Sequence, residues 1–247
     1  FNHQKSLEIK LAVYGEKHSQ TAISYNNLGG VYYLLDRYEE AEFNYQKSLE
    51  VKIFVYGEKH SDTAQCYWGL GIVYYSLGRY EDAEFNHQKS LEIHLAVYGE
   101  KHPSTAMSYN NLGLVYYLLG RYEDAEFNYQ KSLKIHLAVY GEKHPDTAMS
   151  YGNLGNVYRS LSKYEDAEFN YHKSLEIHLT FYGEKHPNTA MSYGNLGNIY
   201  RSLGRYKDAM TNYEKALTIF RKFLPENHSN IEKTKENIEI TKEEMNK

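Results

Sequence analysis

The chain has 247 residues, of which 41% are hydrophobic and 24% charged, and its formal net charge is −4. Acidic and basic residues are interspersed, so neither nucleic acid nor an anionic membrane surface is favoured as a partner. One cysteine, Cys66, excludes an internal disulfide framework, and no apolar run approaches the roughly 18 residues of a membrane span.

The pentapeptide Tyr-Gly-Glu-Lys-His occurs five times, beginning at Tyr14, Tyr56, Tyr98, Tyr140 and Tyr182. Each copy begins 42 residues after the one before it. A fixed period of this size is typical of a stacked-repeat protein. We therefore interpret the pentapeptide as a connector between repeats and not as a catalytic or phosphate-binding loop.

The period divides the chain into repeats. We predict the second helix of a truncated repeat at 1–13, full repeats at 14–55, 56–97, 98–139, 140–181 and 182–223, and a polar capping helix at 224–247. The chain opens Phe-Asn-His-Gln-Lys-Ser-Leu-Glu-Ile, without methionine, and the same string recurs at 85–93. We expect the sequence to start inside a repeat, with its true N-terminus missing.

The third repeat illustrates the unit. A first helix is predicted to start near Pro103, which suits a first helical turn, with Ser104 as the cap. One helical face is apolar or small at i, i+3, i+4 and i+7, namely Tyr109, Leu112, Gly113 and Tyr116. A second helix carries Ala125, Tyr129, Leu133 and Leu137 on its inner face. It is predicted to end at Gly141, which takes a left-handed conformation without penalty. The unit is an antiparallel helix pair with no strand.

Tyr109-x2-Leu112-Gly113-x2-Tyr116, followed by Ala125-x3-Tyr129, resembles the tetratricopeptide (TPR) signature. The 42-residue period is similar to that of kinesin light chains. The resemblance implies an all-α fold, a right-handed alpha-alpha superhelix (TPR solenoid) of helix-turn-helix repeats. It also implies a concave groove lined by the first helix of each repeat. Related 42-residue arrays occur as sensor arms of larger signalling proteins.

The histidines of the connectors do not predict a metal site. Packed helices lie roughly 10 Å apart, whereas zinc ligands lie about 2 Å from one metal. His18, His60, His102, His144 and His186 would therefore form a ladder along the stack. No catalytic set stands out from the repeat background, and Cys66 occupies a position held elsewhere by serine. We expect no enzyme activity, no metal and no cofactor.

The first helix of each repeat has a polar face opposite its core face. Asparagines recur there at Asn27, Asn111, Asn153 and Asn195, interrupted by Gly69. An asparagine amide both donates and accepts hydrogen bonds, so a row of them could hold an extended peptide backbone. The alternative is a solvated polar face that was copied when the repeats were duplicated.

The residues around this ladder change along the chain. The first three repeats present Trp68, Tyr33, Tyr75 and Tyr117, and the last two present Asn156, Asn198, Arg159 and Arg201. Aromatic residues and arginine often carry binding energy, and arginine binds carboxylates with paired hydrogen bonds. The predicted ligand is a linear peptide with an aromatic or apolar anchor near Trp68 and an acidic residue near the arginines.

We therefore expect a non-catalytic scaffold in a reducing, cytoplasmic compartment that binds a protein or linear peptide in its groove. Two alternatives stay open. The chain could be the sensor or assembly arm of a larger signalling protein, or it could be a spacer that self-associates through exposed repeat ends.

Overall fold

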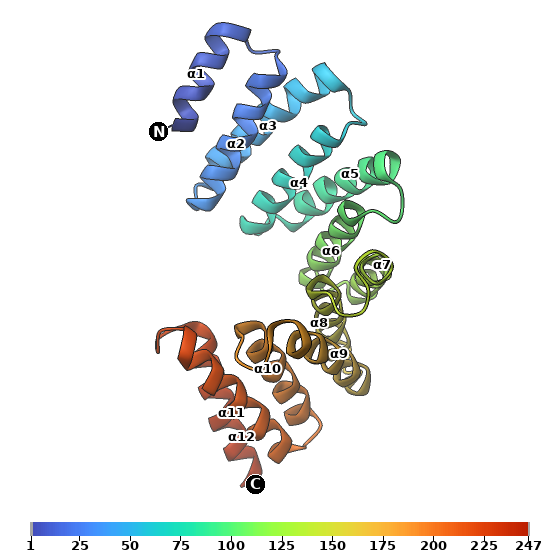
Figure 1. Ribbon diagram of the computed structural model, residues 1–247, viewed down its shortest axis with the longest axis vertical. Helices are drawn as coiled ribbons and strands as arrows, with labels where there is room; N and C mark the ends of the chain where they lie inside the picture. The colour runs from blue at the N-terminus through green and yellow to red at the C-terminus, as the bar shows by residue number, and fades with distance from the viewer. Residues whose placement is uncertain (1, 247) are drawn as a thin grey trace. The chain divides into compact units, whose positions relative to one another are not determined.

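The computed structural model describes residues 2–246, which form twelve α-helices and no strand (Figure 1). The helices are α1 (Asn2–Tyr14), α2 (Ser19–Leu34), α3 (Tyr38–Tyr56), α4 (Ser61–Ser76), α5 (Tyr80–Tyr98), α6 (Pro103–Leu118), α7 (Tyr122–Tyr140), α8 (Pro145–Ser160), α9 (Tyr164–Tyr182), α10 (Pro187–Ser202), α11 (Tyr206–Phe223) and α12 (Ser229–Met245). The prediction of an all-α chain of helix pairs is confirmed for this range. The boundaries assigned to the repeats stay a prediction, and Phe1 and Lys247, in the first and last predicted segments, lie outside the described residues.

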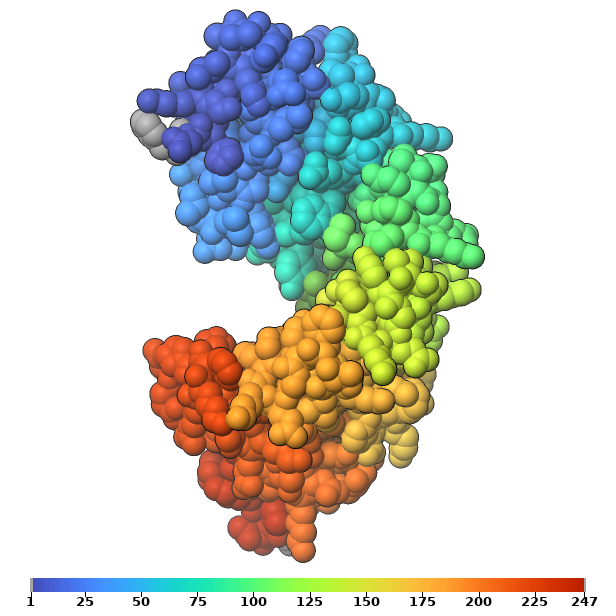
Figure 2. Space-filling model, in the orientation of Figure 1, coloured from blue at the N-terminus to red at the C-terminus, as the bar shows by residue number. Residues whose placement is uncertain are grey.

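The helices form two compact units, and the division falls within α7, between Asn128 and Tyr129. In each unit, helices that follow one another in the chain pack side by side, as α2 does on α3 and α8 on α9. The second helix of one repeat packs on the first helix of the next, as in α3 with α4. In the space-filling view, atoms of consecutive helices lie against one another within each unit (Figure 2). None of the helices between residues 2 and 246 is long and apolar enough to cross a membrane.

The repeated pentapeptide is a helix-to-helix connector. Its glycine ends the preceding helix at a positive φ, which is +82° at Gly141. The hydroxyl of Thr147 donates to the Gly141 carbonyl oxygen at 2.8 Å, which ties the next helix back to this turn. The same bond recurs from Thr21, Thr63, Thr105 and Thr189 at 2.8–2.9 Å. The interpretation of the pentapeptide as a connector is confirmed.

The cap of the first helix is the histidine of the pentapeptide, and the prediction that Ser104 caps this helix is wrong. His102 is the N-cap residue of α6, and its Nδ1 accepts the backbone N–H of Ser104 at 3.1 Å. Ser104 is already inside the helix because Pro103 takes its first position. The same bond occurs at α2, α4, α8, α10 and α12, at 3.1–3.2 Å.

Each of the five pentapeptide histidines is also stacked on the tyrosine that opens its pentapeptide. The ring centroids of Tyr140 and His144 are 4.3 Å apart, with 18° between the ring planes. The other four pairs have centroids 4.1–4.5 Å apart. Stacking fixes the imidazole so that Nδ1 faces the helix start.

Glycines of the first helix allow the second helix to approach closely. A Cβ added at Gly155 would lie 2.6 Å from the ring of Tyr171, and one at Gly197 would lie 2.6 Å from the ring of Tyr213. In the second repeat a histidine takes the tyrosine's place, and a Cβ at Gly71 would lie 2.4 Å from His87. A buried alanine four residues before each ring completes the contact: Ala83, Ala167 and Ala209 are fully buried.

Neighbouring repeats are joined through a histidine of the second helix. The Nδ1 of His94 is hydrogen-bonded to Ser108 Oγ at 2.8 Å, and His178 Nδ1 is bonded to Ser192 Oγ at the same distance. Burial lowers the pKa of both histidines. The interface between α3 and α4 differs, since buried Lys52 takes the histidine's place and its ammonium group donates to a backbone carbonyl oxygen of α4 at 3.1 Å.

The last helix, α12, was predicted to cap the array with polar residues. Glu239 and Lys242 stand where Gly197 and Tyr200 stand one repeat earlier, and both are exposed. They form an ion pair with each other at 2.7 Å. The opposite face of α12 remains apolar, with Ile231 and Ile238 buried against the preceding pair.

Candidate functional site: a polar groove face with unpaired arginines

The polar faces of α8 and α10 line a hollow of about 320 Å³ in unit 2. The hollow brings together three of the predicted residues, Asn153, Asn156 and Asn195. Met149 and Met191 add flexible apolar walls. Gly152 leaves room on one side, because a Cβ there would have only Ser174 Oγ within 4 Å, at 3.6 Å. The hollow therefore combines amide groups with apolar side chains, as ligand-binding pockets do.

Two of the predicted asparagines also have structural partners. The buried hydroxyl of Tyr171 donates to Asn156 Oδ1 at 2.7 Å, and that of Tyr213 donates to Asn198 Oδ1 at 2.8 Å. Burial raises the pKa of Tyr213 to about 12, so its hydroxyl keeps the proton that it donates. Because both amide oxygens are engaged, the amide nitrogens are the groups left to bind a ligand.

Asn237 of α12 extends the asparagine ladder, and sequence reasoning missed it. It lies 42 residues after Asn195, so the repeat register alone could have identified it. Its Nδ2 donates to Asn198 Oδ1 at 3.2 Å. The last member of the ladder thus supports the side chain of Asn198. Asn195 itself has no hydrogen-bond partner among residues 2–246.

Arg159 and Arg201 differ from all other arginines of the chain. The other five are each paired with a carboxylate: Arg37, Arg79, Arg121, Arg205 and Arg221. Neither Arg159 nor Arg201 has an ion-pair partner in the described range. Burial has the largest effect on the pKa of Tyr213, which both positive charges lower and the negative charge of Glu244 raises. The two arginines predicted for the basic end of a groove are thus without an ion pair among residues 2–246, and neither lines the hollow of α8 and α10.

In unit 1 the predicted residues Trp68 and Asn111 lie on α4 and α6. Trp68 Nε1 and Asn111 Nδ2 are both buried, and neither has a hydrogen-bond partner within the part of the chain that the structure describes. A buried donor without a partner is rare and costs about 1–3 kcal/mol. Asn27, by contrast, is exposed. The asparagines of the ladder therefore sit in different environments even though they share one repeat position.

The three predicted tyrosines of unit 1 are half-buried. Tyr33 packs against Tyr38, with ring centroids 5.8 Å apart, and Tyr75 packs in the same way against Tyr80, at 6.2 Å. Tyr117 makes the equivalent contact with Tyr122 at 5.6 Å. Each ring thus packs at the turn between the two helices of its own repeat and exposes only part of its surface.

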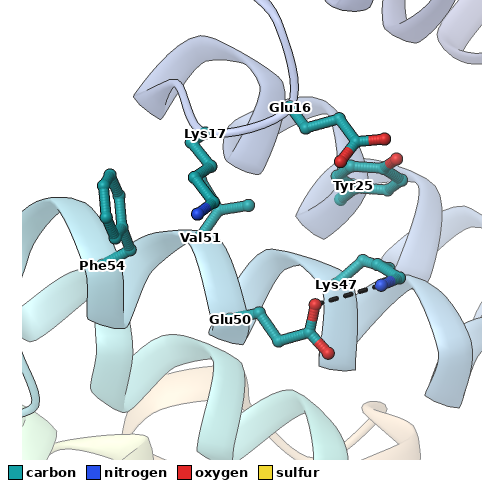
Figure 3. Close-up of a pocket in the computed structure, with 7 residues that line it drawn as sticks. All are labelled: Glu16, Lys17, Tyr25, Lys47, Glu50, Val51 and Phe54. Atoms are coloured by element: carbon teal, nitrogen blue, oxygen red, sulfur yellow. Dashed lines mark hydrogen bonds and ion pairs between the residues drawn. The ribbon is translucent and has the colours of Figure 1, made fainter.

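The connector also borders a smaller hollow of about 130 Å³ in the first repeat. Figure 3 shows Lys47 and Glu50 paired at 3.0 Å on one side, with Lys17 and Phe54 on the other. The Lys17 ammonium nitrogen lies 4.8 Å from the centre of the Phe54 ring. Three charged groups of this crevice thus already have partners inside it, which makes it a weaker candidate than the groove of unit 2.

Residues 2–246 provide neither a metal-binding cluster nor a reactive thiol. No group of three or more histidine, cysteine or acidic side chains within residues 2–246 is placed to hold a metal ion. Cys66 is fully buried, with Sγ 3.3 Å from Ser48 Oγ, and burial raises the pKa of its thiol. A buried thiol of raised pKa is a poor nucleophile.

The helix pairs and their groove face define a repeat solenoid, a class of scaffold that presents extended binding surfaces. The family model of the tetratricopeptide repeat matches residues 2–53, 44–95, 86–137, 120–179 and 170–222. These matches cover most of the chain, which therefore belongs to the tetratricopeptide repeat family. No curated protein matches the sequence.

Solved structures share the fold. BtubC (BKLC) from P. vanneervenii is 21% identical, with a TM-score of 0.78 over 92% of each chain. A Podosopora anserina structure described as "kinesin light chain nearly identical TPR-like repeats" is 18% identical, with a TM-score of 0.73 over 83% of this chain and 97% of that one. MamA is 20% identical, with a TM-score of 0.56 over 83% and 94%. At these identities the likeness establishes the fold alone.

Proposed function

We propose that this chain is a non-catalytic scaffold whose groove face in unit 2 binds an extended, acidic peptide segment of a partner protein. The observation that carries the proposal is the pair of arginines, Arg159 and Arg201, that have no carboxylate partner among the described residues. Every other arginine of the chain is already paired. A peptide carboxylate would supply the missing partner and form charge-assisted hydrogen bonds with the guanidinium groups.

The hollow between α8 and α10 supports the same ligand. Asn195 offers an amide that has no partner among residues 2–246, and it can bond the backbone of an extended peptide without regard to its sequence. Met149 and Met191 provide apolar walls that adapt to a side chain of the peptide. The ligand is therefore a strand-like segment in which acidic and apolar residues lie close together. A cytoplasmic location stays a prediction.

A peptide-array screen tests the proposal. The purified chain is probed with peptides in which acidic content and apolar content vary independently. We expect peptides that contain both to be selected, and their binding to fall about tenfold or more in Arg159→Glu/Arg201→Glu, a loss of about 1.4 kcal/mol or more.

A charge-matched control distinguishes binding at the two arginines from attraction of the peptide by the overall charge of the chain. Lys185→Glu/Lys222→Glu changes the net charge by the same amount at two exposed lysines that lie outside the groove lining. This control should bind the selected peptides as the wild-type chain does. If the two double variants lose binding equally, or if no peptide is selected, the groove proposal is rejected.

A further inference from the structure

The outer helices carry exposed phenylalanines at one repeat position. Phe43, Phe85, Phe127 and Phe169 are 55%, 56%, 57% and 58% exposed. Single exposed apolar residues are ordinary, but a large aromatic side chain kept exposed in four successive repeats forms a set. Three of the four, on α3, α5 and the start of α7, belong to unit 1.

A glutamate lies one turn before each phenylalanine. These residues are Glu39, Glu81, Glu123 and Glu165, all exposed and none with an ion-pair partner in the described range. The acidic residue that follows each of the first three is paired instead, as Asp82 is with Arg79 at 2.8 Å. We call Phe43, Phe85 and Phe127, with Glu39, Glu81 and Glu123, the phenylalanine face of unit 1.

A hollow adjoins this face in the first repeat. It measures about 450 Å³ and lies between α1 and α3, over α2. Leu7, Leu28 and Tyr32 contribute apolar lining, and Glu39 and Phe43 stand on the α3 side. Each of these five residues recurs unchanged 42 positions later, as Leu49, Leu70, Tyr74, Glu81 and Phe85. In the second repeat Leu70 and Tyr74 are buried, so the part of this surface that recurs exposed is the phenylalanine with its glutamate, and the hollow belongs to the first repeat.

The fold does not require this face. In α11 the corresponding positions are Thr211 and Lys207, which are both exposed. The core residues beside them are nevertheless kept, since Ala209 and Tyr213 are fully buried as the corresponding alanine and tyrosine of α9 are. The charge of the helix also changes where the phenylalanine is absent. Helix α5 carries four acidic residues and one lysine, whereas α11 carries four basic residues and two acidic ones.

We propose that the phenylalanine face of unit 1 docks a basic, apolar segment of a partner protein. Apolar side chains of that segment would cover the phenylalanines and enter the hollow beside Phe43. Its lysines or arginines would pair with Glu39, Glu81 and Glu123. A cation can also lie directly over such a ring. Within the chain, the Lys89 ammonium nitrogen lies 5.9 Å from the centre of the Phe85 ring. This surface is separate from the groove of α8 and α10 and takes a ligand of the opposite charge.

Three labelled synthetic peptides test the proposal by fluorescence anisotropy. The first is an amphipathic peptide of leucine and lysine, the second replaces each lysine with glutamate, and the third replaces each leucine with serine. We expect only the first to bind the wild-type chain well, and its binding to weaken as salt is raised.

The chain itself supplies the matched variant. Phe43→Thr/Phe85→Thr/Phe127→Thr installs the residue that α11 already uses, so helicity and melting should stay close to those of the wild type. Binding of the leucine–lysine peptide should fall about tenfold or more in this variant. It should be unchanged in Arg159→Ala/Arg201→Ala, which alters the groove of unit 2 only and adds no negative charge there.

Four results would overturn the proposal. They are equal binding by the threonine variant, equal binding of the glutamate peptide, equal binding of the serine peptide, and no binding of any peptide.

Discussion

Histidine has several structural roles among residues 2–246, depending on its position in the repeat. His144 caps a helix with Nδ1, His178 bridges two repeats, and His87 fills the place of a core tyrosine. The sequence predicted that the connector histidines are structural, and the cap confirms it. The sequence did not predict that the imidazole Nδ1 caps the helix, because serine is the more frequent N-cap residue and Ser104 stands at a suitable position.

The capping role predicts the cost of removing one histidine. His144→Ala should destabilise the chain by about 1 kcal/mol through loss of the cap, with a further contribution from the lost stacking on Tyr140. His144→Asn should keep most of the capping contribution, since asparagine is a good N-cap. Urea unfolding of the two variants checks this prediction, and equal midpoints for alanine and wild type would contradict it.

The buried histidine predicts a dependence of stability on pH. Burial lowers the pKa of His87 to about 4 in the folded chain, against 6.5 when it is exposed. The folded state therefore favours the neutral imidazole, and its contribution is complete above pH 6.5. As the pH falls from 6.5 towards 4, His87 binds a proton in the unfolded chain but not in the folded chain, so the free energy of unfolding decreases.

His87→Phe isolates this effect, because its ring is similar in size and does not titrate. Between about pH 7 and pH 4.5 the free energy of unfolding of the wild-type chain should fall by about 2 kcal/mol more than that of the variant. Urea titrations at the two pH values measure the difference. Equal losses would show that His87 is protonated in the folded chain.

At the scale of the element, the helix boundaries were predictable and the contacts between helices were only partly so. The 42-residue period and the glycines placed the helix ends, because a positive φ after each second helix is a local requirement. The sequence also indicated that small residues allow close approach. That the tyrosine ring of the second helix rests on the glycine, and that its hydroxyl bonds Asn156, depends on tertiary packing that no single helix encodes.

Two glycines of the first helices give a matched test of this packing. Gly155→Ala should destabilise the chain by about 1–3 kcal/mol, because the new Cβ would lie 2.6 Å from Tyr171. Gly194→Ala should instead stabilise it by up to about 1 kcal/mol, since nothing lies within 4 Å of that Cβ and alanine favours a helix. Melting temperatures that shift in the same direction would show that the ring of Tyr171 does not limit the approach of the helices.

At the scale of the whole molecule, the repeats determine the fold, and the departures from the repeat indicate function. The family and its helix pairs follow from features that recur, and they were predictable for that reason. The unpaired arginines belong to the last two full repeats, and the phenylalanine position changes to threonine in α11. Arg159 and Arg201 could be named from the sequence as groove residues, but only the structure shows that every other arginine has a carboxylate partner.

The proposed function depends on Arg159 and Arg201 binding a carboxylate of a peptide ligand. The most direct measurement is a reciprocal charge swap, in which the acidic peptide and a version with lysine at its acidic positions are each titrated against wild type and Arg159→Glu/Arg201→Glu. We expect the acidic peptide to bind only the wild type well and the lysine peptide to recover binding to the variant. Equal affinity of the acidic peptide for both proteins would contradict a role for the two arginines in binding.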